Sequence, residues 1–306
     1  MASLKNIKLK IISVKKTSTV TRAMEAVSAV KMRKSQERAL STRMFAAAAL
    51  SALERLAGSA DMSSYPLMQS HPGKTVIIVV TSDKGLAGSL NSAIIKKAET
   101  EIRDRGLSVA ETIIIAIGRR GADYFANRGY EVRVRHENVS DDISETDVRS
   151  ITDTLIAAHA SGEVGTALVV YQNFISTFEQ HPSMRQIVPV TAETMRDFVQ
   201  HIRPARGKYA PTEATTDSHA TMPYSIEPSA EAVLAVLLPK LLNIAIFHAL
   251  LENKASEHSA RMVAMKNATD NAKERAKQYT RTFNKIRQAS ITREISEITS
   301  GIEAMR

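Results

Sequence analysis

The sequence has 306 residues, a formal net charge of +9 and no cysteine. This length suffices for one or two domains with a sizeable core, and the lack of cysteine excludes both a disulfide framework and a thiolate metal site. No apolar run approaches the roughly 20 residues that span a bilayer. Because the N-terminus carries lysines but no apolar signal core, we expect a cytosolic protein.

Charge and helix-breaking residues divide the chain in the same way. Residues 1–57 carry 12 Lys and Arg against 3 acidic residues, residues 240–306 carry 12 against 7, and residues 58–239 carry 17 against 22. All nine prolines and eleven of the twelve glycines lie within residues 58–239. Since proline and glycine interrupt helices, the sequence predicts a long basic helix at each end and a turn-rich domain between them.

The N-terminal segment has the apolar spacing of a helix that packs along one side. Its first apolar residues follow a heptad pattern, which consists of Leu4, Ile7, Ile11 and Val14. The pattern weakens at two polar positions, Ser18 and Thr21. We therefore expect the buried seam to move to Val20, Met24 and Val27.

The C-terminal segment predicts a second long helix. Pro228 and Ser229 form a start signal, and we expect Pro239 to bend the helix or to end a first segment. About 65 helical residues follow Pro239, which corresponds to roughly 100 Å. Two long helices with partial apolar stripes, joined by a compact domain, favour an antiparallel two-helix coiled coil.

The middle segment predicts α/β units. The buried-type runs "KTVIIVV", "TIIIAI" and "ALVVYQNF" alternate with helical patterns, one of which has Ser144 as a candidate cap. Residues 185–190 suggest an edge strand, and residues 205–223 a loop. The expected fold class is α/β, a Rossmann-like domain with a mainly parallel sheet plus the coiled coil. The expected domains are residues 1–57, 58–223 and 224–306.

The sequence shows no persuasive active site. The turn "TSDKGLAGSLN" opens a helix, where phosphate often binds, but it lacks both glycine-rich phosphate motifs, so tight-turn geometry explains Gly85 and Gly88 better. The eight histidines have no metal-binding spacing, and no G-x-S-x-G is present. Asp141 and Asp142 are interpreted as a solvated loop pair. We expect no catalytic residues, no cofactor, no metal, and a chain that is not an enzyme by itself.

Five motifs together resemble one known family, the gamma subunit of bacterial F-type ATP synthase. In the family's order they are "VTRAMEAVSAVKMRKSQ", "TSDKGLAGSLN", "EPSAEAVLAVLLP", "ENKASEHSARMVAMKNATDNA" and "RQASITREISEITSG". The resemblance covers the whole chain. Two local departures are Ile302, where the family usually has alanine, and Ala87-Gly88-Ser89, where it often has Cys-Gly-Gly.

The resemblance implies a rotor shaft that couples rotation of a membrane ring to nucleotide sites during ATP synthesis or hydrolysis. The implied partners are the alpha and beta subunits, the epsilon subunit and the c-subunit ring. The chain would be peripheral, on the cytoplasmic face of the bacterial inner membrane, with membrane contact only through the complex. The driving ion is taken to be the proton.

The resemblance also implies contact residues. Those facing the beta subunits, some of them through an acidic segment, would be Met24, Lys31, Arg33, Lys34, Arg261, Arg287, Gln288 and Thr292. Tyr224 and Glu227 would lie next to the c ring and the epsilon subunit. The alternatives are coiled-coil packing at Met24 and ordinary surface roles for the other polar residues that would face the beta subunits. For the last two residues they are packing of Tyr224 in the domain and charge–dipole capping of the helix by Glu227.

Two other classes of protein would also use basic helices. A nucleic-acid-binding coiled coil would favour interleaved aromatic residues, yet residues 1–57 contain only Phe45. A membrane-surface helix would favour large apolar anchors, yet the chain has no tryptophan. Neither nucleic acid nor a bare membrane is therefore the expected partner.

Overall fold

The computed structural model describes residues 4–56, 65–191, 193, 194, 227 and 229–305; for residues 40–51 and 53–56 it describes the backbone only. The elements in chain order are α1 (Leu4–Leu56), η2 (Pro66–Met68), β1 (Lys74–Val80), α2 (Leu90–Asp104), β2 (Thr112–Ile117), α3 (Arg119–Ala126), β3 (Glu131–His136), α4 (Glu145–Ala160), β4 (Val164–Phe174), β5 (Gln180–Val188) and α6 (Ala230–Glu303).

The chain forms two compact units. A helical unit comprises Met1–Ala29 and Arg261–Arg306, and an α/β unit comprises Val30–Ala260. Parts of both long helices therefore belong to the α/β unit. The expected domain boundaries, 57/58 and 223/224, fall among residues outside the described ones and stay predictions.

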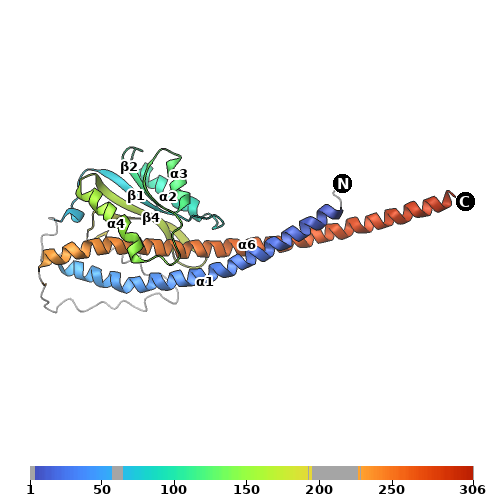
Figure 1. The fold of residues 1–306 in the computed structure, drawn as a ribbon, viewed down its shortest axis with the longest axis horizontal. Coiled ribbons are helices and arrows are strands. Elements are labelled where there is room, and N and C mark those ends of the chain that lie inside the picture. Colours follow the sequence, from blue (N-terminus) through green and yellow to red (C-terminus); the bar gives the residue numbers. More distant parts are fainter. Residues whose placement is uncertain (1–3, 57–64, 192, 195–226, 228, 306) are drawn as a thin grey trace. The chain divides into compact units, whose positions relative to one another are not determined.

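A five-stranded sheet in the order β3-β2-β1-β4-β5 forms the centre of the α/β unit (Figure 1). The first four strands are parallel, and β5 pairs antiparallel with β4. Helices α2 and α3 cover one face of the sheet, while α4 and the first part of α6 cover the other. The Rossmann-like α/β domain with a mainly parallel sheet is confirmed.

The central strands form where the sequence has runs of β-branched residues. In β1 and β2 every residue except Lys74 is buried, as expected for strands covered by helices on both faces. The two outer strands are more polar. Gln180–Val188 confirms the expected edge strand, whereas β3, "EVRVRH", was not predicted because its alternating charged residues leave it half-exposed at the other edge.

Helix α4 begins at the expected cap. The side chain of Asp147 accepts hydrogen bonds from the backbone N–H of Ser144 at 2.7 Å and from its hydroxyl at 2.8 Å. These bonds lower the pKa of the Asp147 carboxyl. A carboxylate in the first turn also complements the positive end of the helix.

Helix α6 departs from the expectation at Pro239. It is continuous from Ala230 to Glu303, with Pro239 inside it. Ser229 caps the start, since its hydroxyl accepts the backbone N–H of Ala232 at 3.2 Å. An interior proline removes the hydrogen bond that its N–H would have donated, and its ring crowds the carbonyl of the residue four positions earlier. Apolar packing of the residues around Pro239 against the core supports the helix there.

The same helix corrects the expectation about apolar runs. An 18-residue window of α6 has a mean hydropathy of 2.0, so by length and composition it could cross a membrane. However, 61% of this window is buried within the described structure. Leu242, Ile246 and Leu250 belong to the core on one sheet face. The window therefore has the burial of a core helix.

A buried histidine holds the segment before β1 against the end of α4. His159 is 1% exposed. Its Nδ1 lies 2.7 Å from the carbonyl oxygen of Val164, and its Nε2 lies 2.8 Å from that of Pro66. The ring also stacks on His71 at 4.4 Å between centroids. One side chain thus ties η2, α4 and β4 together.

Replacing His159 by alanine is expected to destabilise the α/β unit by about 2–4 kcal/mol, because the polar contacts of the ring are lost and a buried ring leaves a void. Urea unfolding followed by circular dichroism measures the loss. His181→Ala is the matched control, because His181 is 61% exposed. Equal effects of the two substitutions would contradict the assigned role of His159.

Candidate partner-binding surfaces

In the helical unit the two helices pair in antiparallel fashion. The Oγ1 atoms of Thr21 and Thr269 are 2.6 Å apart, and the Lys10 ammonium lies 5.9 Å from the ring centroid of Tyr279. From Thr21 toward the N-terminus at Lys10, the contacting residue on α6 moves from Thr269 toward the C-terminus at Tyr279. Only antiparallel helices pair in this way. Both contacts lie within the helical unit, so the expected coiled-coil pairing is confirmed there.

The seam between these helices does not move as predicted. Thr21 and Ser28 are 9% and 3% exposed, whereas Val20 and Val27 are 58% and 55% exposed. The original heptad spacing therefore continues through polar residues. Small side chains let the helices approach closely, and the Thr21–Thr269 hydrogen bond satisfies a buried hydroxyl pair. The prediction failed because it required the seam to be apolar.

Apolar side chains consequently remain on the outside of the helical unit. On α1 these are Leu9, Ile12, Val20 and Val27, which are 43–58% exposed. On α6 they are Ile291, Ile295, Ile298 and Ile302, which are 48–62% exposed. Ile291, Ile295, Ile298 and Ile302 follow heptad spacing. A row of exposed apolar residues on a helix is typical of a surface that contacts another protein.

The helical unit contains five of the residues predicted to contact a partner. Met24 lies beside the seam and is half-buried, as is Arg261. Arg287, Gln288 and Thr292 are exposed. The Thr292 hydroxyl donates to the Gln288 carbonyl oxygen at 3.0 Å, so these two residues lie on one face of α6. Their side chains are accessible to a partner.

In the α/β unit, a basic stripe on α1 faces the loop between β3 and α4. The Lys31 ammonium lies 2.6 Å from an Asp141 carboxylate oxygen, and the Lys34 ammonium lies 2.6 Å from one of Asp142. Arg38 contributes a 3.3 Å contact to Asp142 and donates to the Asp141 carbonyl at 3.1 Å. Positions 31, 34 and 38 share one helical face. The interpretation of Asp141 and Asp142 as a merely solvated pair is therefore wrong.

Asp141 also binds α6. His258 Nε2 lies 3.0 Å from Asp141 Oδ1, and the Lys254 ammonium lies 3.7 Å from the same oxygen. Lys254 donates to the Val139 carbonyl at 2.9 Å as well. The hydrogen bond from His258, and then that from Lys31, hold the pKa of Asp141 well below its usual range although partial burial opposes this. Asp141 thus joins α1, α6 and its own loop.

The α/β unit is expected to lose stability in acid partly through Asp141. Its folded-state pKa is lowered, so the stabilisation is fully present above the ordinary aspartate pKa of about 3.9 and disappears as the pH falls toward the folded-state value. Asp141→Asn should lower the free energy of unfolding at pH 7, and its difference from wild type should shrink below about pH 4. A pH series of urea unfolding curves measures this, and a constant difference would contradict it.

The remaining predicted residues are placed only in part. Arg33 is exposed and forms no ion pair with any residue that the structure describes. Glu227 is exposed. Tyr224 lies outside the described residues.

The glycine-bearing turn after β1 has its own internal support. Asn91 Oδ1 accepts the backbone N–H of Ser82 at 2.9 Å, and the Asn91 amide donates to the Ser82 hydroxyl at 2.8 Å. Leu86 and Gly88 have φ values of 65° and 58°. These contacts close a tight turn, in line with the reading from sequence. Among the described residues no cluster of His, Asp or Glu could hold a metal ion.

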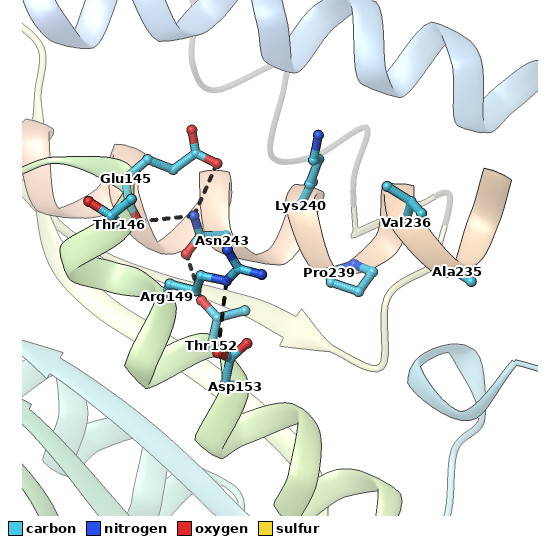
Figure 2. A pocket seen from close by; sticks show the side chains of 10 residues that line it. All are labelled: Glu145, Thr146, Arg149, Thr152, Asp153, Ala235, Val236, Pro239, Lys240 and Asn243. Atoms are coloured by element: carbon cyan, nitrogen blue, oxygen red, sulfur yellow. Dashed lines mark hydrogen bonds and ion pairs between the residues drawn. The ribbon is translucent and has the colours of Figure 1, made fainter. Parts of the chain in front are cut away.

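A pocket of about 460 Å³ lies between α4 and the start of α6. Figure 2 shows the amide of Asn243 reaching across to α4, where it donates to the Glu145 carbonyl and carboxylate at 3.2 Å each and accepts from Thr152 at 2.9 Å. The charged side chains of Glu145, Arg149, Asp153 and Lys240 line it. Its lining contains no nucleophile paired with a general base, so it does not have the composition of a hydrolytic site.

Sequence reasoning missed five members of the α1–loop–α6 contact, namely Arg38, Asp141, Asp142, Lys254 and His258. One signal was available, because Arg38 continues the spacing of Lys31 and Lys34 along the helix. The link from Asp141 to His258 spans 117 positions, and no local pattern reveals it.

Comparisons with known proteins agree over the full length. A family model described as ATP synthase matches residues 3–305. A protein of Pelotomaculum thermopropionicum named ATP synthase gamma chain is 37% identical, and one of Heliobacterium modesticaldum with the same name is 36% identical, each over 100% of both chains.

Solved structures show the same fold at low identity. A chain of the Euglena gracilis mitochondrial ATP synthase, from an OSCP/F1/c-ring structure, has a TM-score of 0.64 at 15% identity and covers 99% of this chain and 94% of that one. A central stalk/c-ring chain from Tetrahymena thermophila has a TM-score of 0.57 at 21% identity and covers 81% and 99%.

Proposed function

The chain belongs to the family of ATP synthase gamma chains, the central rotor shafts of that complex, and we propose that its two units divide the work of this shaft. The helical unit would turn inside a hexamer of alpha and beta subunits. The α/β unit would connect it to the epsilon subunit and to a proton-driven c ring. The rotor would bias each nucleotide site through contacts that differ between rotary orientations, because a coupling requires such a difference in free energy.

The observation that carries this proposal is the construction of the helical unit. Its seam consists largely of small or polar residues, such as Thr21 and Ser28, and several isoleucines and valines remain exposed. An antiparallel helix pair resists bending, and scattered apolar side chains on its surface suit a sleeve within which it must turn. Large interlocking side chains would bind too firmly.

Contacts with the catalytic subunits would be of two kinds. Lys31, Arg33 and Lys34 would meet an acidic segment of the beta subunits, with Met24 near it. Arg261, Arg287, Gln288 and Thr292 would bond to loops of the hexamer in one orientation. Exposed charge pairs contribute about 0–1 kcal/mol each, which permits contact and release during rotation.

Alanine at Gln288 or Thr292 is expected to lower ATP turnover or assembly of the complex without changing the stability of the free chain. A charge-assisted bond is worth about 1.5–3 kcal/mol, enough to favour one orientation, and both side chains are exposed. Double-mutant cycles against loop residues of the beta subunit measure the coupling. Strictly additive effects for every loop partner would show that Gln288 and Thr292 make no specific bond with the beta subunit.

Tyr224 and Glu227, which precede α6 in the sequence, would contact the c ring and the epsilon subunit. The complex would lie at the bacterial inner membrane with this chain on the cytoplasmic face. Alanine at both positions should loosen coupling between proton flow and ATP synthesis while it spares ATP hydrolysis by the detached hexamer. Unchanged synthesis and pumping would remove this assignment.

The chain would not be catalytic by itself, and this tests the proposal most directly. Phosphate release from ATP is measured for the purified chain, for alpha and beta subunits, and for all three together. We expect turnover only when alpha and beta subunits are present, and an increase when the chain is added. Turnover by the chain alone, abolished by a point substitution within it, would contradict the proposal.

A further inference from the structure

The loop between β3 and α4 offers the basic stripe of α1 an acidic partner from the same chain. The structure gives Lys34 and Arg38 a shared carboxylate, Asp142. Neighbouring Arg33, off the stripe, has no such partner among the described residues. Helix α1 therefore carries engaged cations on the stripe and an unengaged cation beside it.

The two aspartates differ in how firmly they are held. Asp141 is 31% exposed and is also bound by His258, whose side chain is 4% exposed. Asp142 is 58% exposed, and Lys34 is 59% exposed. Exposed ion pairs of this kind are weak and screened by salt, whereas a carboxylate with several partners at a half-buried site is retained. The ion pair between Asp142 and Lys34 can therefore be exchanged while the contact between Asp141 and His258 remains.

We propose that Asp142 is an internal competitor, which binds Lys34 and Arg38 in the free chain and yields them to an acidic protein segment when one docks on this face of α1. The occupant is acidic because the side chains that Asp142 releases are a lysine and an arginine. This inference rests on the proposed function for the identity of the natural partner. Its physical content is independent of that identity. Asp142 would lower the affinity of the docking surface and thereby keep the contact reversible.

Exchange requires little rearrangement. Asp141 is anchored on α6 by His258 and keeps the loop in place. Lys34 needs only to change rotamer to reach a carboxylate outside the chain. Arg33 can join without losing any ion pair to a described residue. The docking surface therefore consists of Lys34, of Arg38, which exchanges Asp142 while it keeps its hydrogen bond to the Asp141 carbonyl, and of Arg33 beside the stripe.

The first experiment uses the purified full chain and a fluorescent octaglutamate peptide in low-salt buffer, with fluorescence anisotropy as the readout. Asp142→Asn should tighten binding about threefold, because it removes two weak, exposed ion pairs that compete with the peptide for Lys34 and Arg38. Asp153→Asn is the matched control: it removes the same charge from an exposed ion pair on α4 that does not face the stripe. Any tightening that Asp153→Asn produces measures the effect of the changed net charge alone.

Two further measurements make the test decisive. In the Lys34→Gln/Arg38→Gln background, the additional gain from Asp142→Asn over Asp153→Asn should vanish. In wild type with aspartate carboxyls labelled with ¹³C, the pKa of Asp142, which Lys34 lowers in the free chain, should rise toward its ordinary value when the peptide binds. Equal gains from both asparagine variants, a gain that persists in the double background, or an unmoved Asp142 titration would each overturn the proposal.

A reconstituted complex separates this inference from the proposed function. ATP hydrolysis is measured for wild type, Lys34→Gln and Asp142→Asn, each in the presence of alpha and beta subunits. Opposite effects of the two variants on turnover support internal competition at the natural interface. If the peptide results hold but turnover is insensitive to Lys34, the competitor stands and the assignment of the beta subunit as its partner fails.

Discussion

Replacing Gly118 by alanine is expected to destabilise the α/β unit by about 4 kcal/mol or more, one of the largest losses available from a single methyl group. Gly118 joins β2 to α3 with a φ of 94°. A Cβ there would lie 2.1 Å from the Thr81 carbonyl oxygen and 2.6 Å from its carbonyl carbon. Both atoms belong to the backbone of Thr81, which directly follows β1 and is 5% exposed, so neither can move aside cheaply.

The clash can be separated from backbone strain with a second glycine. Gly129 has a φ of 82°, but a Cβ there would meet nothing within 4 Å. Gly129→Ala should therefore cost only the left-handed backbone penalty of about 1–2 kcal/mol. Urea unfolding of the two variants measures the difference. If Gly118→Ala were no worse than Gly129→Ala, the close approach of Gly118 to Thr81 would not be a constraint in solution.

Replacing Met24 by lysine is expected to leave ATP hydrolysis by the assembled complex running while its coupling to proton pumping falls severely. Met24 is half-buried beside the seam of the helical unit, where the stem of a lysine can lie along apolar surface with its ammonium in solvent. The new charge could then pair with the acidic segment proposed for the beta subunit. A charge-assisted contact of about 1.5–3 kcal/mol would slow departure from one orientation roughly 10- to 100-fold.

Met24→Gln is the control, because like Met24→Lys it places a long polar side chain at this position but adds no charge. Hydrolysis and proton pumping are measured in membrane vesicles, and thermal unfolding is measured on the free chain. The charge mechanism predicts that only the lysine variant uncouples. If Met24→Lys instead loses thermal stability and assembly together, Met24 acts mainly in packing between the two helices.

Most of the fold was predictable because the turn, strand and helix-start patterns occupy different parts of the sequence. Glycine and proline confine the turns to the middle of the chain, the Val- and Ile-rich runs mark β1, β2 and β4, and Ser144 and Ser229 mark helix starts. Each of these signals acts within a few residues, so a linear pattern displays it.

The misses share a different physical origin. Strand β3 is paired on one side only, so its sequence alternates and lacks an apolar run. Pro239 is tolerated because packing of α6 outweighs the lost hydrogen bond and the crowding of the proline ring. The contact of Asp141 with Lys31 and His258 joins residues 110 and 117 positions apart. Such contacts follow from the assembled fold, and composition offers no hint of them.

The buried hydroxyl pair of Thr21 and Thr269 also determines which alignment of the two helices is lowest in free energy. A seam rich in small residues such as Ala272 and Ala276 discriminates poorly between alignments offset by one heptad. Such an offset would place Thr21 opposite Met262 or Ala276 and remove the hydrogen bond between the helices. Losing it costs about 1 kcal/mol, as a single polar residue does when it specifies register in a coiled coil. The pair thus fixes the register of the two helices and opposes sliding of one helix along the other when the shaft is twisted.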